Sequence, residues 1–118
     1  MNKKKIIFCF DLDNTICTTK KSNYLNSKPK KKIIKLINKL YDQGHIIKIN
    51  TARYMGRNED DIKLSNKQGF KKTFKQLKLW GLKFNKLAIS KLSADIYIDD
   101  KSYGYSGRWV KDFKKFIK

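Results

Sequence analysis

Short apolar runs alternate with amphipathic stretches along the chain. The runs are too short for buried helices and predict β-strands at residues 6–10, 45–50, 87–89 and 96–98. Apolar positions recur at helical spacing in three other stretches, which predict helices at residues 30–42, 70–80 and 108–118. Gly44 and Gly81 follow the first two of these helices and are typical helix-ending residues. Strands thus alternate with helices over most of the chain.

This alternation predicts one α/β domain over residues 1–118, a Rossmann-like three-layer sandwich with a mainly parallel central sheet. Five consecutive apolar residues at 6–10 indicate a strand that is buried on both faces. The intervening polar segments, residues 18–32 and 54–67, are expected to be loops and are too short to hold an inserted domain. The apolar runs are also too short for a signal peptide or a membrane span, so a cytoplasmic protein is expected.

Acidic residues follow two of the predicted strands. Asp11 and Asp13 come directly after the first strand, and Asp99 and Asp100 follow the last. Because parallel strands present their carboxyl ends at one edge of a sheet, these acids and Thr51 are expected to meet in one crevice. Paired carboxylates in such a crevice suit a hard cation such as Mg²⁺. The alternative is a local turn or helix cap at each acidic pair.

The motif Asp11-Leu12-Asp13-Asn14-Thr15 resembles the DxDxT signature of the haloacid dehalogenase superfamily, which consists mostly of magnesium-dependent phosphatases. Thr51, Lys91 and the pair Asp99-Asp100 resemble its other three motifs, in the same order. The sequence TAR at residues 51–53 and the short spacing from Lys91 to YIDDK are similar to a small branch without a cap domain. That branch is associated with capsule or surface-polysaccharide biosynthesis.

The resemblance implies a reaction mechanism. Asp11 would attack the phosphorus and form an aspartyl-phosphate, and Asp13 would act as general acid and base. Thr51 and the backbone N–H groups near Leu12 and Ala52 would bind the phosphoryl oxygens. Lys91 would balance negative charge, with Lys71 or Lys72 as alternatives because Ser90-Lys91-Leu92 departs from the usual Gly-Lys-Pro. Mg²⁺ would bind the two acidic motifs through Asp11, Asp13, Asp99 and Asp100.

A phosphorylated sugar or polysaccharide precursor is the substrate that the resemblance suggests. The residues expected to select it, with Ala52 beside them, are Tyr24, Lys28, Arg53 and Arg57. Arg53 would contact the substrate through its bidentate guanidinium, or pair instead with Asp60 or Asp61. Without a cap, the site would be open to bulky substrates, or a second subunit would cover it.

The formal net charge of +19 introduces two further hypotheses. One is a phosphatase that acts on nucleic-acid ends, and the other is a non-catalytic basic binding protein with a phosphatase-like fold. Lysine supplies 26 of the 29 basic residues and is spread over the whole chain, which favours a solvated surface over specific phosphate recognition. Cys9 and Cys17 form no CxxC pair and are expected to be structural thiols, with Cys9 inside the buried first strand.

Overall fold

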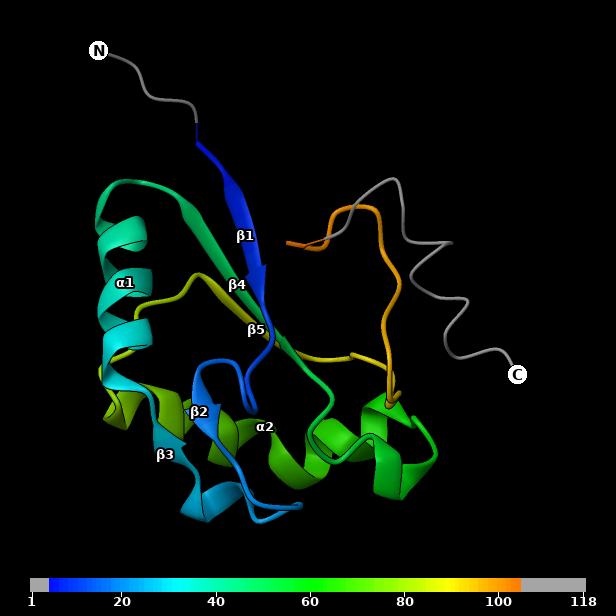
Figure 1. Ribbon diagram of the computed structural model, residues 1–118. Coiled ribbons are helices and arrows are strands. Elements are labelled where there is room, and N and C mark those ends of the chain that lie inside the picture. The colour runs from blue at the N-terminus through cyan, green and yellow to red at the C-terminus, as the bar shows by residue number, and fades with distance from the viewer. Residues whose placement is uncertain (1–4, 105–118) are drawn as a thin grey trace.

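The computed structural model describes residues 5–104 of the chain (Figure 1). Five strands are present: β1 (Ile7–Phe10), β2 (Cys17–Thr18), β3 (Lys28–Pro29), β4 (Ile46–Thr51) and β5 (Lys86–Ile89). Two α-helices, α1 (Lys31–Asp42) and α2 (Ile62–Leu79), and two 3₁₀ turns, η1 (Tyr24–Asn26) and η2 (Gly56–Asn58), complete the described part. These elements form a small α/β domain.

The main sheet contains three parallel strands in the order β1-β4-β5. The register pairs Phe10 with Ile49, and Ile49 in turn with Leu87. The middle strand, β4, therefore lies between the strand that carries the Asp11–Asp13 motif and the strand that leads to Lys91. The predicted parallel sheet is confirmed for these three strands.

Both helices pack on one face of this sheet. A single buried cluster combines Ile34 and Ile37 of α1 with Leu77 of α2 and Ile47 and Ile49 of β4. The burial of β4 alternates along the strand, because successive side chains point to opposite faces. Helices α1 and α2 end just before Gly44 and Gly81, which adopt φ values of +92° and +75° as their predicted role requires.

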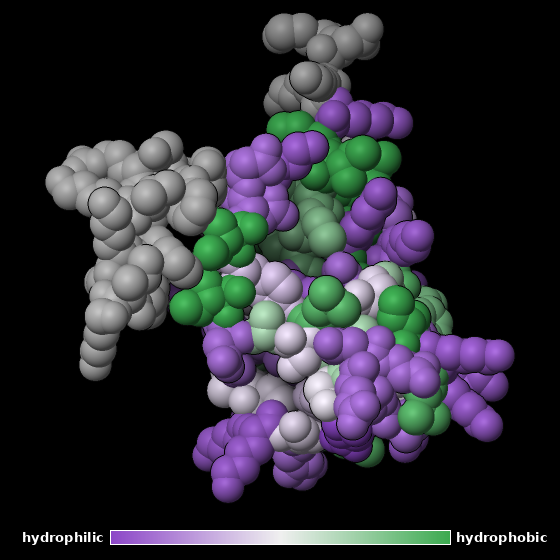
Figure 2. All heavy atoms as spheres, turned by 90° about the vertical axis from the view of Figure 1, so that its right-hand side faces the viewer, coloured by the Kyte–Doolittle hydropathy of each residue, from purple (hydrophilic) through white to green (hydrophobic). Residues whose placement is uncertain are grey.

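The opposite face of the sheet is open in the described residues. The prediction that the first strand is buried on both faces is therefore wrong: Ile7 is 59% exposed and Cys9 is also exposed. Lys48 pairs with Cys9 in the sheet and lies on the same face. The predicted third layer would need the terminal helix, which lies outside residues 5–104. Hydrophobic side chains reach the surface on the side of the molecule shown in Figure 2.

The predicted strand at residues 96–98 does not form. Ile96 and Ile98 are about half exposed, and no strand pairing is present in this segment. After β5 the chain leaves the edge of the sheet and turns away from the strands (Figure 1). Asp99 lies in an exposed turn, where its carboxylate accepts the N–H of Lys101 at 2.9 Å. The turn interpretation of this acidic pair is the one that the structure shows.

The two predicted loops contain more structure than their polarity indicated. Residues 17–29 form a hairpin segment in which β2 and β3 pair antiparallel and η1 contacts α2. Helix α2 begins at Ile62, inside the second predicted loop, because Asp61 caps it by accepting the N–H of Leu64 at 3.0 Å. Neither segment holds an inserted domain. None of the helices in residues 5–104 is long and apolar enough to cross a lipid bilayer.

Gly69 allows α2 to approach the loop that follows β4. A Cβ atom at this position would overlap the ring of Tyr54. We therefore expect Gly69→Ala to lower the free energy of unfolding by about 1–3 kcal/mol, although alanine is the better helix former. Chemical denaturation measures the change. In a Tyr54→Leu background the same substitution should be neutral or stabilising, and an equal loss in both backgrounds would contradict this packing.

Candidate active site

The carboxyl ends of the three parallel strands bring three of the predicted site residues together. Asp11 follows β1, Thr51 ends β4, and Lys91 lies two residues beyond β5. The backbone N–H of Lys91 donates to the carbonyl of Thr51 at 3.3 Å, and Ser90 donates to the Asn50 side chain at 3.0 Å. These bonds hold the segment after β5 against the end of β4. The predicted convergence of Asp11, Thr51 and Asp99 at this edge is therefore present only in part: Asp11 and Thr51 meet there with Lys91, whereas Asp99 lies in the exposed turn.

The turn after β1 separates Asp11 from Asp13. Leu12 between them is fully buried in the core, and its carbonyl accepts the N–H of Ile16 at 2.8 Å. Asn14 adopts a positive φ of 65°, a conformation that asparagine tolerates better than most residues. Because the side chain of Leu12 is fixed in the core, the carboxylates of Asp11 and Asp13 on either side of it lie in different surroundings.

Asp11 is the more open of the two carboxylates, with 36% of its side chain exposed. Its Oδ1 lies 3.6 Å from the ammonium of Lys91, and its Oδ2 accepts the hydroxyl of Thr15 at 3.2 Å. Lys91 is thus the lysine that forms an ion pair here, rather than the alternatives Lys71 and Lys72. The ring of Tyr97 lies 4.2 Å from the Lys91 ammonium. Burial, and then the nearby charges of Asp11 and Asp60, raise the pKa of the Tyr97 phenol.

Thr51 and Ala52 lie at the carboxyl end of β4. Thr51 is 1% exposed, and its hydroxyl oxygen accepts the N–H of Arg53 at 3.1 Å. The hydroxyl proton is used in no hydrogen bond among the described residues. Ala52 is half-buried, and its carbonyl accepts the N–H of Met55 at 2.9 Å.

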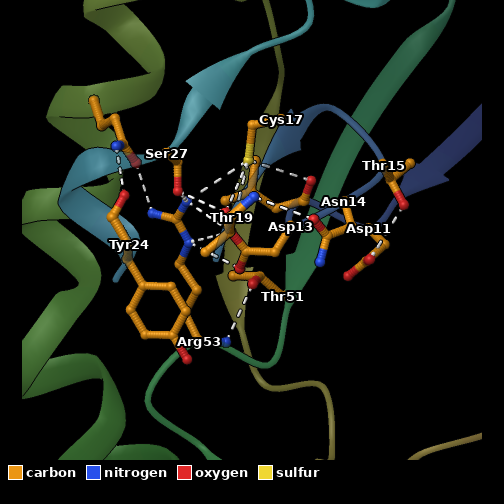
Figure 3. Close-up of polar contacts among 12 residues, drawn as sticks. Asp11, Asp13, Asn14, Thr15, Cys17, Thr19, Tyr24, Ser27, Thr51 and Arg53 are labelled. Carbon is orange, nitrogen blue, oxygen red and sulfur yellow. Dashed lines mark hydrogen bonds and ion pairs between the residues drawn. The ribbon is translucent and has the colours of Figure 1, made fainter. Parts of the chain in front are cut away.

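Arg53 lies inside the protein and pairs with Asp13 (Figure 3). Its side chain is 1% exposed, and Nη2 lies 2.9 Å from Asp13 Oδ1. Both predicted roles of Arg53 are therefore replaced: it is too buried to contact a bulky substrate, and its partner is Asp13 rather than Asp60 or Asp61. Asp60 instead accepts the N–H of Ser93 at 3.0 Å.

Polar residues of the hairpin segment and α2 complete the surroundings of Arg53. Its Nη1 donates to Gln76 at 2.6 Å, and its Nη2 donates to Ser27 at 3.3 Å. Thr19 donates to Asp13 at 2.5 Å. None of these three residues is among the site residues predicted from the sequence. Gln76 could have been suspected from the sequence. It stands beside Leu77 among the core positions of α2, where a buried polar side chain needs a hydrogen-bond partner.

The remaining residues expected to select the substrate lie around the hairpin segment. The ring of Tyr24 lies between two guanidinium groups, at 4.9 Å from that of Arg53 and 5.7 Å from that of Arg57. Arg57 also lies 4.8 Å from the ring of Tyr54 and is exposed. Lys28 in β3 is exposed to solvent. Of these, Arg57 and Lys28 keep a charge that is accessible to a substrate.

The expected Mg²⁺ ligands are only partly assembled. Asp11 offers an accessible carboxylate, but Asp13 is bound to Arg53, and Asp99 and Asp100 lie in the exposed turn. Within residues 5–104, no three acidic, histidine or cysteine side chains are grouped so that they could hold a metal. The described ligands therefore fit a Mg²⁺ ion incompletely.

Comparisons with known proteins identify a similar fold. The chain matches no protein-family model and no curated protein. It is similar to the crystal structure of a target protein from Vibrio cholerae, with a TM-score of 0.77 over 96% of this chain and 99% of that one. The two sequences are 20% identical, so this similarity shows the fold alone.

Cys17 and Cys9 should differ sharply in reactivity. Burial, above all, raises the pKa of Cys17, so at pH 8 its thiol stays protonated more than an exposed thiol does, and only the thiolate reacts. We expect iodoacetamide to modify the exposed Cys9 of the native protein and to spare Cys17. Mass spectrometry measures the modification. A Cys9→Ser variant should stay unmodified until it is unfolded, and rapid native labelling of that variant would contradict the buried site.

Proposed function

We propose that the protein is a phosphomonoesterase that acts through an aspartyl-phosphate. The observation that supports this most is the division between the two aspartates. Asp11 is accessible and lies beside a lysine, whereas Asp13, two residues away, is fixed by a buried arginine. The two aspartates thus have different partners, and the proposal gives them different roles: Asp11 is the nucleophile and Asp13 the proton-transfer group. The proposal includes the finer fold assignment, a capless Rossmann-like domain of the haloacid dehalogenase type.

The proposed reaction has two steps. In the first, a carboxylate oxygen of Asp11 attacks the phosphorus, the bond from phosphorus to the leaving oxygen breaks, and Asp13 gives that oxygen a proton. In the second, Asp13 takes a proton from water as the water attacks the phosphorus of the aspartyl-phosphate. Inorganic phosphate leaves and the Asp11 carboxylate is restored.

Positive charge and hydrogen-bond donors stabilise the phosphoryl group. The Lys91 ammonium, 3.6 Å from Asp11, offsets the negative charge of the nucleophile and the phosphate. The free proton of the Thr51 hydroxyl, with backbone N–H groups of the turn after β1, would bind phosphoryl oxygens. Mg²⁺ is the proposed cofactor, with Asp11 and the backbone carbonyl of Asp13 as ligands, and it supplies further charge neutralisation when bound. The substrate proposed is a phosphorylated sugar or polysaccharide precursor, in the cytoplasm.

Asp11→Asn should abolish activity. The substitution keeps the shape of the side chain but removes the nucleophile, so hydrolysis of a generic aryl phosphate should fall at least about a thousandfold. Wild-type activity should require added Mg²⁺ and disappear with a chelator. Phosphate release in a continuous assay measures both effects.

Asp42→Asn is the matched control. It removes a carboxylate that pairs with Lys83 on the surface at the end of α1 and contacts none of the site residues. Its activity should equal that of the wild type. An active Asp11→Asn variant, or a wild type inactive with every divalent metal, would exclude the proposed reaction.

A second candidate function, a phosphatase acting on nucleic-acid ends, is favoured by one surface feature. A groove of about 1070 Å³ runs along α1 and the end of α2. It contains none of the site residues. Its lining combines the aromatic ring of Trp80 with several lysines: Lys31, Lys32, Lys35, Lys39 and Lys83.

Salt dependence should separate the two substrate classes. A sugar phosphate makes few ionic contacts, so its kcat/KM should change little between 50 and 200 mM salt. A 5′-phosphorylated oligonucleotide held by several lysines would lose affinity steeply over about this range. We expect the sugar phosphates to be the better substrates. Higher kcat/KM on oligonucleotides, with a steep salt dependence, would favour the second function instead.

A further inference from the structure

Every nitrogen of the Arg53 guanidinium group donates a hydrogen bond to a partner inside the protein. Nε donates to both oxygens of Asp13 at 3.1 and 3.0 Å, and Nη2 donates to Oδ1 at 2.9 Å. Nη1 donates to Gln76 at 2.6 Å, and the ring of Tyr24 covers the group at 4.9 Å. Burying a charge in this way is costly unless the group is paired and hydrogen-bonded, and here each of the three nitrogens has at least one partner.

The two oxygens of Asp13 are bound unequally. Oδ1 accepts four hydrogen bonds: two from Arg53, one from the hydroxyl of Thr19 at 2.5 Å and one from the thiol of Cys17 at 3.6 Å. Oδ2 accepts one, from Arg53 Nε. Since each carboxylate oxygen has about two lone-pair sites, Oδ1 is saturated and Oδ2 retains acceptor capacity. The side chain as a whole is 20% exposed, so the carboxylate is not sealed from the site.

A chain of hydroxyl groups fixes Oδ1 from a second direction. Thr19 uses its single proton on Asp13, so in its 2.6 Å contact with Ser27 it accepts the Ser27 proton. Ser27 in turn accepts from Arg53 Nη2 at 3.3 Å. Arg53 therefore reaches Asp13 Oδ1 both directly and through Ser27 and Thr19. Both routes leave Oδ2 as the less restrained oxygen.

We propose that Arg53 is a positioning residue that aligns Asp13 so that Oδ2 transfers the proton to and from the reacting oxygen. This inference rests on the proposed phosphatase function. Oδ2 carries the proton to the leaving oxygen as its bond to phosphorus breaks, and later receives the proton of the attacking water. Arg53 acts on the reaction only through its contacts with the Asp13 carboxylate.

Dependence on the leaving group tests this role. A nitrophenolate departs almost without a proton, whereas an alkoxide requires one. We expect Arg53→Lys to reduce kcat/KM for an alkyl phosphate such as glycerol phosphate by about a hundredfold, and for p-nitrophenyl phosphate by no more than about threefold. Lysine keeps the charge but not the two-point contact that fixes the carboxylate. The inhibition constant of inorganic phosphate should stay unchanged, because phosphate binding does not use Arg53.

Asp13→Asn supplies the reference pattern. It should show the same preference for the activated substrate, and adding Arg53→Lys to it should cause no further loss, since both changes disable one proton transfer. Thr19→Val removes a neutral hydrogen bond to Oδ1 and should give a smaller loss with the same preference. This variant keeps the test decisive if the arginine variants do not fold, which circular dichroism reports.

If Arg53→Lys or Thr19→Val lowered kcat/KM equally for the two substrates, the role of Arg53 would be purely structural and the proposal would be wrong. Weaker inhibition by inorganic phosphate would instead make it a phosphate-binding residue, and would also overturn the proposal. Failure of the underlying function looks different. In that case the wild type hydrolyses neither substrate, or Asp11→Asn is as active as the wild type.

Discussion

The buried ion pair between Arg53 and Asp13 is the interaction on which the rest of the site depends. It joins the turn after β1 to the end of β4, and through Gln76 and Ser27 it connects both to α2 and the hairpin segment. An unpaired guanidinium at 1% exposure would be strongly unfavourable. The pair can therefore form only when all four parts of the fold are in place, so the site and the fold are completed together.

Much of this arrangement follows from the sequence. Short apolar runs predict the three parallel strands, and the rule that ligands lie at their carboxyl ends places Asp11 and Thr51 at one edge, although it also places Asp99 there, where the structure does not. The alternation of β4 also indicates that Arg53 is buried. Residues 47, 49, 51 and 53 are alternate positions along the chain, which point to the same face of a strand, and the first three are buried. A charge at the fourth position of that series needs an acidic partner, and Asp13 is near enough once the register of β1 and β4 is known.

Other features could not be predicted from local pattern. An apolar triplet at residues 96–98 has the composition of a strand, but strand formation depends on a neighbouring strand to pair with, and this segment has no such pairing in the structure. The burial of β1 on one face only is likewise a tertiary property. Apolar spacing does not predict the start of α2, because its first turns are polar and the cap at Asp61 decides where the helix begins.

The two aspartates of the motif are paired with different cations, and the chemistry of these cations matches the proposed roles. Arginine offers a rigid, bidentate contact that fixes Asp13 in orientation. Lysine offers a mobile point charge at 3.6 Å, which neutralises Asp11 without restricting it. Two other acids among residues 5–104 also have partners: Asp42 pairs with Lys83, and Asp61 caps α2. The remaining cationic surface, at a net charge of +19, repels itself, so added salt should stabilise the folded state by screening.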